Sequence, residues 1–331
     1  MKNNENDRHD PHRRRFVCDC MKYAAGLALL NTVPSFIGCA SGQSRAATSS
    51  ASSTSPALLK SKATEVSQNL VSRATKGNPY DLTFRAVESL GGMDKFVHDG
   101  ESVMLMPNIA WDRSPEQAAT THPDVVRAVI EMCKKAGASE IGVFCNSCHP
   151  AQSTYKTSQI AEVAEKAGAK VWYVQPNRDF VPMDVNGKNL KTTMVYNKLL
   201  EADRFISIPI AKVHSLSKYT ICFKNLMGAI KDRPALHPNI QQDLADLSMV
   251  LKPDLNIVDA SRILIKNGPT GGSLADVRKP EIVIASANPV SADAVGMELF
   301  GQPPTALGCL KIAKELGRGE YDLSLLEIRE A

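Results

Sequence analysis

Short apolar runs alternate along this chain with stretches of helical periodicity. Six continuous apolar runs predict buried strands, at residues 101–107, 140–145, 170–175, 204–210, 255–260 and 281–287. Apolar positions three and four residues apart predict helices at 58–75, 80–97, 121–138, 158–169, 194–202, 243–252, 288–301 and 305–317. In the helix at 121–138, Thr121 is the expected N-cap, Pro123 lies in the first turn and Gly137 ends the helix.

Strands and helices alternate, and the strands are apolar throughout rather than at every second position. We therefore expect an α/β fold with a mostly parallel sheet and helices on both of its faces. In such sheets ligands bind beyond the carboxyl ends of the strands. Four segments fall at such ends, namely residues 107–108, 145–149 and 212–214 and Asp259.

Residues 1–39 have the features of an export signal. Arg13 and Arg14 are followed one residue later by Phe16, which fits a twin-arginine signal. The apolar stretch at 23–30 is too short to cross a bilayer, which takes about 20 residues. We therefore expect export by the twin-arginine route, to the periplasm or cell envelope.

The segment around Cys39 resembles a lipoprotein cleavage site, which would place acyl chains on Cys39 and anchor the protein to a membrane. The alternative is ordinary cleavage after Ala46. Residues 40–57 are rich in Ser and Ala, which predicts a flexible linker. Residues 58–331 are then expected to form a single α/β domain.

Composition and charge limit the classes of binding partner that we expect. The hydrophobic content of 43% and the charged content of 22% are ordinary for a soluble globular protein. The formal net charge is only +4 and aromatic residues make up 5%, so we expect no nucleic-acid partner.

Two cysteines and a histidine stand together as Cys145, Cys148 and His149. This Cys-x-x-Cys-His spacing is typical of c-type haem attachment, but it also suits half a zinc site, a redox dithiol or a disulfide. A structural zinc site needs four ligands, and two thiols alone do not supply them. We favour a Cys148 that lines a site, with Cys145 free or disulfide-bonded to it, over haem attachment.

The densest candidate chemistry lies in residues 209–237. The stretch contains five cationic side chains and a single acid, Asp232, and His214 and His237 lie near its two ends. Such a segment suits an anionic ligand such as a carboxylate or phosphate, and nearby cations should lower the pKa of each histidine. A solvated basic helix face is the alternative. The cations are Lys212, Lys218, Lys224, Lys231 and Arg233.

A second candidate segment runs from Asp259, at a strand end, to a glycine-rich loop that contains Gly268 and Gly271. Such a loop can present backbone N–H groups to an anion, although a tight turn explains the glycines equally well. Asp293 lies early in a helix, where helix stabilisation or metal ligation would explain it.

Several stretches together resemble the domain-of-unknown-function family 362 in its exported form, from about residue 100 to the C-terminus. The most specific are "IPIAKVHSLSKYTICFKNLMGAIKDR" and "NIVDASRILIKNGPTGG". The resemblance implies an α/β domain and no established reaction. Some relatives carry ferredoxin-like cysteine repeats, which this chain lacks, so an iron–sulfur cluster is not implied. By analogy with the family motif the site comprises Asn108, Lys212, His214, Lys224, Asn225, Arg233, His237 and Asp259.

The leading hypothesis is an exported enzyme that binds a divalent metal, an anionic small molecule, or both, at the carboxyl edge of the sheet. His214 and His237 would act as acid and base, or would bind the metal together with Cys148. Lys212 and Lys224 would take part in catalysis beside them. The alternatives are a redox protein that uses Cys145, Cys148 and His149, and a non-catalytic lipoprotein that binds a ligand or partner.

Overall fold

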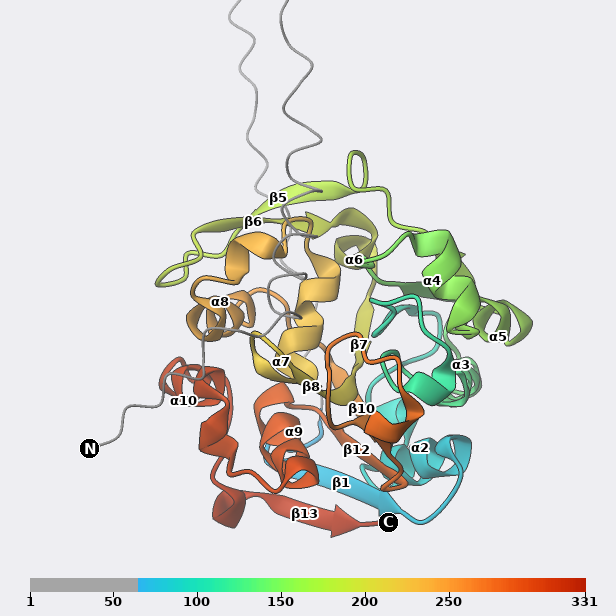
Figure 1. Ribbon diagram of the computed structural model, residues 1–331. Coiled ribbons are helices and arrows are strands. Elements are labelled where there is room, and N and C mark those ends of the chain that lie inside the picture. Colours follow the sequence, from blue (N-terminus) through green and yellow to red (C-terminus); the bar gives the residue numbers. More distant parts are fainter. Residues whose placement is uncertain (1–64) are drawn as a thin grey trace, which may run out of the picture. The chain divides into compact units, whose positions relative to one another are not determined.

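The central sheet contains eight strands along its main path, in the order β13-β1-β12-β10-β7-β2-β3-β4. Figure 1 labels the first five strands of this path. The computed structural model describes residues 65–331. The strands of this path are β1 (Leu70–Thr75), β2 (Ser102–Pro107), β3 (Glu140–Phe144), β4 (Lys170–Trp172), β7 (Arg204–Ile208), β10 (Leu255–Leu264), β12 (Ile282–Ser286) and β13 (Glu327–Glu330).

The sheet is mostly parallel, as the sequence predicted. The pairs β2–β3, β3–β4, β2–β7, β7–β10 and β1–β13 are parallel, and β12 runs antiparallel to both of its neighbours, β1 and β10. Three short strands extend the sheet at β10: β8 (Ile210–His214), β9 (Lys218–Thr220) and β11 (Val277–Arg278). A separate antiparallel hairpin consists of β5 (Phe180–Asp184) and β6 (Thr192–Tyr196).

Helices cover both faces of the sheet, which explains its continuous apolar strands. In β2, Val103 and Leu105 join one apolar core, while Met104 and Met106 join the other. The first core packs against α2 (Pro79–Glu88), α3 (Pro123–Lys135), α4 (Ala151–Thr157) and α5 (Ile160–Lys166). The second packs against α6 (Asn197–Glu201), α7 (Cys222–Asn225), α8 (Ile240–Leu247), α9 (Pro289–Gly296) and α10 (Gly308–Glu315), and Figure 1 shows α2 and α9 on either side of β1 and β12.

The predicted helix at 58–75 is wrong where the structure describes it, because residues 70–75 form strand β1. Leu70 and Val71 are adjacent in sequence and both buried, and they belong to opposite cores. A strand covered on both faces lacks polar alternation, so its apolar residues can imitate a helical stripe.

Three other helix predictions need correction. The helix predicted at 80–97 ends at Glu88, because Gly91 and Gly92 both adopt positive φ before a short 3₁₀ turn at Met93–Lys95. In the predicted helix at 194–202, the first residues belong to β6 and only Asn197–Glu201 is helical. The N-cap of α3 is His122 rather than Thr121.

The predicted export signal and linker lie outside the described residues, and so do Arg13, Arg14 and Cys39. Within residues 65–331, no helix is long and apolar enough to span a bilayer.

Candidate functional site

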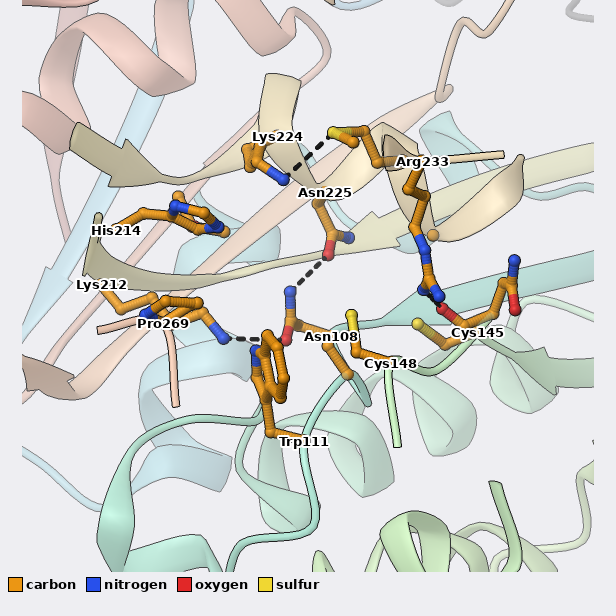
Figure 2. A pocket seen from close by; sticks show the side chains of 15 residues that line it. Asn108, Trp111, Cys145, Cys148, Lys212, His214, Lys224, Asn225, Arg233 and Pro269 are labelled. Carbon is orange, nitrogen blue, oxygen red and sulfur yellow. Dashed lines mark hydrogen bonds between the residues drawn. The ribbon is translucent and has the colours of Figure 1, made fainter. Parts of the chain in front are cut away.

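A small cavity of about 50 Å³ lies where β2, β3 and β8 end, beside α7 (Figure 2). This is the carboxyl edge of the parallel strands, where α/β sheets bind ligands. Its lining residues come from four stretches of the chain and from the loop after β10: Asn108, Ala110, Trp111, Cys145, Asn146, Cys148, Lys212, His214, Thr220, Lys224, Asn225, Met227, Gly228, Arg233 and Pro269.

Two buried asparagines, Asn108 and Asn225, line the cavity and are held in place by hydrogen bonds. Asn225 donates through Nδ2 to the Met106 carbonyl oxygen at 3.0 Å and to Ser207 Oγ at 3.1 Å, and its Oδ1 accepts from Asn108 Nδ2 at 3.1 Å. Asn108 Oδ1 in turn accepts from Lys212 Nζ at 3.2 Å. This chain of hydrogen bonds ties α7 and β8 to the end of β2, so it holds the lysine in a defined position.

Lys212 is 1% exposed, and its second hydrogen bond goes to the Ala119 carbonyl oxygen at 2.5 Å. Both acceptors are neutral oxygens rather than carboxylates. Burial is the main cause that lowers the pKa of Lys212 to about 7, and the charge of Lys224 lowers it further against an opposing effect of Cys148. A large fraction of Lys212 is therefore neutral near pH 7.

His214 presents a donor to the cavity. Its Nδ1 accepts hydrogen bonds from the backbone N–H groups of Leu216 at 3.1 Å and Ser217 at 3.4 Å. Burial, followed by Lys224 and Lys212, lowers its pKa well below the usual value, so the ring is neutral. A neutral imidazole that accepts at Nδ1 carries its proton on Nε2.

Three cationic side chains line the cavity, and no carboxylate does. Burial lowers the pKa of Lys224 to about 8, and its Nζ lies 3.1 Å from Met227 Sδ. Arg233 donates to the carbonyl oxygens of Asn146 and Ser147, the latter at 2.8 Å. Among residues 65–331, none of the three cations pairs with an acid.

Thr220 adds an unused polar atom to the same cavity. Its side chain is 2% exposed, and Oγ1 has no hydrogen-bond partner within the described part of the chain. Buried hydroxyl groups almost always find a partner. An anion bound here would accept from this hydroxyl as well as from the cations.

Cys145 and Cys148 both line the cavity as free thiols, but they differ in exposure. Cys145 is buried, and burial raises its pKa to about 11, whereas Cys148 is exposed. Tyr155 fixes the start of this loop, because its hydroxyl accepts from the Cys145 N–H and donates to the Cys145 carbonyl oxygen. A buried, protonated Cys145 is poorly suited to haem attachment or to thiolate chemistry.

Asp293 positions the helix that carries Lys224 and Asn225. Its carboxylate accepts from the backbone N–H groups of Cys222 at 2.6 Å and Phe223 at 3.1 Å, at the start of α7. The role is therefore stabilisation of a helix start, in a helix other than its own.

A family model described as "Domain of unknown function (DUF362)" matches residues 103–298 of this chain. The chain belongs to this family. A curated relative, "Thylakoid-associated protein sll1697" of Synechocystis sp., is 24% identical over 272 residues, which cover 80% of this chain and 79% of that protein.

Two solved structures were also found to be similar. A lactate racemase apoprotein from Thermoanaerobacterium thermosaccharolyticum gives a TM-score of 0.45 at 13% identity and covers 68% of this chain. A Thermotoga maritima protein gives a TM-score of 0.38 at 10% identity and covers 72%. The matches span only 56% and 60% of those two chains.

The DUF362 match contains every residue that lines the cavity. Of the site residues predicted from the sequence, seven line the cavity: Asn108, Cys148, Lys212, His214, Lys224, Asn225 and Arg233. Seven lining residues were not predicted: Ala110, Trp111, Asn146, Thr220, Met227, Gly228 and Pro269. Each follows a strand end or lies in a segment that the sequence analysis singled out, and this position is the signal that could have found them.

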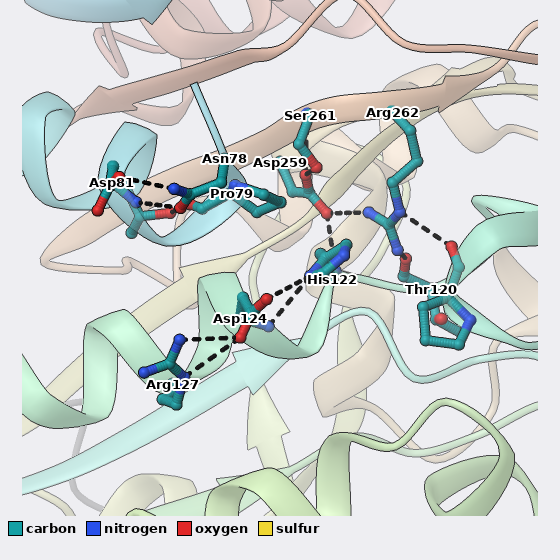
Figure 3. A network of polar contacts seen from close by, with 12 residues as sticks. Asn78, Pro79, Asp81, Thr120, His122, Asp124, Arg127, Asp259, Ser261 and Arg262 are labelled. Atoms are coloured by element: carbon teal, nitrogen blue, oxygen red, sulfur yellow. Dashed lines mark hydrogen bonds and ion pairs between the residues drawn. The ribbon is translucent and has the colours of Figure 1, made fainter. Parts of the chain in front are cut away.

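Asp259 lies away from this cavity, so its assignment to the site is wrong. The fully buried carboxylate pairs with Arg262, accepts from Ser261 Oγ at 2.7 Å and accepts from the His122 N–H at 2.8 Å (Figure 3). The network joins the start of α3 to β10. Asp259 therefore helps to hold the start of α3 against β10 in this DUF362 protein.

The glycines of the loop after β10 are required by packing and conformation. A Cβ on Gly268 would lie 1.9 Å from the Val213 carbonyl oxygen, and Gly271 has a φ of +54°. Neither lines the cavity, whereas Pro269 between them does. The tight-turn interpretation therefore replaces the prediction that these glycines bind a ligand.

The predicted metal ligands His214, His237 and Cys148 do not form a ligand set. In residues 65–331, no group of three or more His, Cys, Asp or Glu side chains has an arrangement that could hold a metal. His237 does not line the cavity, and His214 would have to give up its two backbone hydrogen bonds to bind a metal through Nε2. A lining of three basic side chains without an acid also disfavours a divalent ion.

Proposed function

We propose that this protein is an enzyme that binds a small anion, a carboxylate or phosphate, in the cavity and acts on it by proton transfer. The observation that carries the proposal is a cavity lined by Lys224, Arg233 and the partly neutral Lys212, with no acid. Lys224 and Arg233 hold the negative charge of the ligand, and the His214 Nε2–H and the Thr220 hydroxyl donate to its oxygens.

Lys212 is the proton acceptor in this proposal. Burial lowers the pKa of Lys212 to about 7, so a substantial fraction of this amine is neutral near neutral pH and can accept a proton.

Calorimetric titration with acetate, pyruvate and phosphate tests the binding step. We expect Lys224→Gln to weaken binding at least about tenfold, since a charge-assisted hydrogen bond contributes roughly 1.5–3 kcal/mol. Lys231→Gln is the matched control, because Lys231 is exposed and outside the cavity. Equal affinities in wild type and both variants would contradict the proposal.

Solvent exchange tests the catalytic step. Wild-type protein in deuterated water should introduce deuterium beside the carboxylate of a bound carbon acid, as followed by proton NMR, and Lys212→Arg should not. Binding without exchange on any carbon acid would point instead to a non-catalytic binding protein.

We also propose that the protein is exported and anchored to a membrane by lipid on Cys39. The support is the arrangement of Arg13, Arg14 and Cys39 in the sequence. The relative from Synechocystis is named for its association with the thylakoid, which supports a place at a membrane.

A further inference from the structure

The hydrogen bonds of Lys212 hold its amine in an arrangement that suits a nucleophile. Its Nζ has three positions besides the bond to Cε, and two of them donate to Asn108 Oδ1 and the Ala119 carbonyl oxygen. A neutral amine has two N–H bonds and one lone pair. With both N–H bonds engaged, the lone pair occupies the third position, on a side chain that lines the cavity.

The two acceptors stabilise this arrangement without requiring a charge on the lysine. Both are neutral oxygens, and Asn108 is itself fixed by Asn225. Among the described residues, no carboxylate pairs with Lys212 to hold it as an ammonium ion. A desolvated lysine beside other cations is a recognised form of activated amine nucleophile.

The rest of the cavity suits a carbonyl compound that also carries negative charge. Lys224 and Arg233 offer cationic donors for a carboxylate (Figure 2). The His214 Nε2–H and the unpartnered Thr220 hydroxyl are neutral donors for an oxygen that gains charge as a carbonyl is attacked. The small volume, about 50 Å³, favours a ligand of few atoms.

We propose that Lys212 forms an imine with the carbonyl group of a small oxoacid bound in this cavity, an inference that rests on the proposed anion site and gives Lys212 a covalent role toward oxoacids in place of proton acceptance. Nζ forms a bond to the carbonyl carbon, and the carbonyl π electrons move onto oxygen. That oxygen takes both amine protons and leaves as water, while the nitrogen lone pair completes the C=N bond. One amine and one carbonyl thus give one imine and one water, with no oxidant or reductant.

Reductive trapping tests the proposal. The protein, expressed without residues 1–39 so that it remains unlipidated, is incubated with pyruvate or glyoxylate and cyanoborohydride, which delivers hydride to an imine carbon. We expect one adduct per chain by intact mass, and peptide mapping should place it on Lys212. Excess acetate should slow the labelling, because it competes for the cations.

Lys212→Arg keeps a long basic side chain that cannot form the imine and should abolish the adduct, while Lys231→Gln should label as wild type does. If exposed lysines such as Lys231 label as fast as Lys212, or if acetate gives no protection, the imine proposal is wrong.

Binding measured without reductant separates this proposal from the one on which it rests. Pyruvate that binds in calorimetry and yields no adduct on Lys212 overturns the imine and leaves the anion site standing. Pyruvate and acetate that do not bind at all overturn both. Since trapping is read on wild-type protein, the test does not depend on the folding of any variant.

Discussion

At the scale of single residues, the charge of the cavity depends on the buried Lys212 and the half-buried Lys224, whose protonation changes with pH near neutrality. The pKa of Lys212 is lowered to about 7 and that of Lys224 to about 8. A bound anion favours the charged form of each lysine, so binding raises both pKa values and takes up protons. Anion affinity is therefore highest below pH 7, where both lysines are already charged. It falls as the pH rises through 7 and 8.

We therefore predict that the Kd for acetate rises between pH 7 and 9, by up to about tenfold per pH unit for each linked proton. Calorimetry in two buffers of different ionisation enthalpy should show proton uptake at pH 7.5 (a value between the two pKa values). Lys224→Gln should reduce the slope, and Lys231→Gln should leave it unchanged. A Kd that is constant over this range would mean that the two lysines do not hold the anion.

At the scale of secondary-structure elements, the site depends on the short helix α7, which is too short to be stable by itself. Asp293 of α9 accepts the N–H groups of Cys222 and Phe223 and so fixes the start of α7. We predict that Asp293→Asn lowers the free energy of unfolding by about 1–3 kcal/mol, because the amide nitrogen cannot accept the second N–H. Urea unfolding followed by circular dichroism measures this loss.

The same substitution should weaken acetate binding, because α7 carries Lys224 and Asn225. Asp232→Asn is the matched control, since Asp232 is exposed and lies outside the cavity. A stable Asp293→Asn variant with wild-type affinity would show that α7 is held by other contacts.

The elements also show what the sequence could predict. The strands β2, β3, β7 and β10 were found because each is a continuous apolar run, and Asn108, Lys212 and His214, which the sequence places after strand ends, line the cavity. Strand β1 was missed because its pairing with β12 and β13 is set by segments more than 200 residues away, which local periodicity does not report.

Among the site residues, too, some could be predicted from the sequence and others could not. Thr220 reaches the cavity only because β9 folds back on β8, a pairing with no strong turn signal in the sequence. Asp259 was misplaced because a carboxylate at a strand end looks the same in sequence whether it faces a ligand or Arg262. Position at a strand end therefore predicted the location of a side chain but not its partner.

At the scale of the whole molecule, a bound anion would join separate parts of the fold. The cavity draws side chains from the ends of β2 and β3, from β8, and from α7 and the loop after it. A ligand that binds only the folded state stabilises it by about 2.7 kcal/mol at a hundredfold excess over Kd. We predict that acetate at this excess raises Tm by roughly 5–10 °C.

Differential scanning calorimetry at fixed ionic strength measures this shift, with chloride as the control for salt. Lys224→Gln should show a smaller shift at the same acetate concentration, because its affinity is lower. An equal shift in chloride would assign the effect to screening of charge rather than to the cavity.

In the proposed export route, the N-terminal signal determines the compartment of the protein, and its residues are not among those that line the cavity. We predict that Cys39→Ser releases the protein from the membrane fraction into the soluble part of the envelope, because two acyl signals or more are needed for stable anchoring and the variant has none. Changing Arg13 and Arg14 to lysine should instead keep the protein inside the cell with its signal uncleaved. Cell fractionation with intact mass measurement separates the two results. The residues that line the cavity run from 108 to 269, so the anion affinity should be the same in every fraction. A soluble wild-type protein without lipid would contradict the anchoring prediction and would show that cleavage occurs elsewhere, as after Ala46.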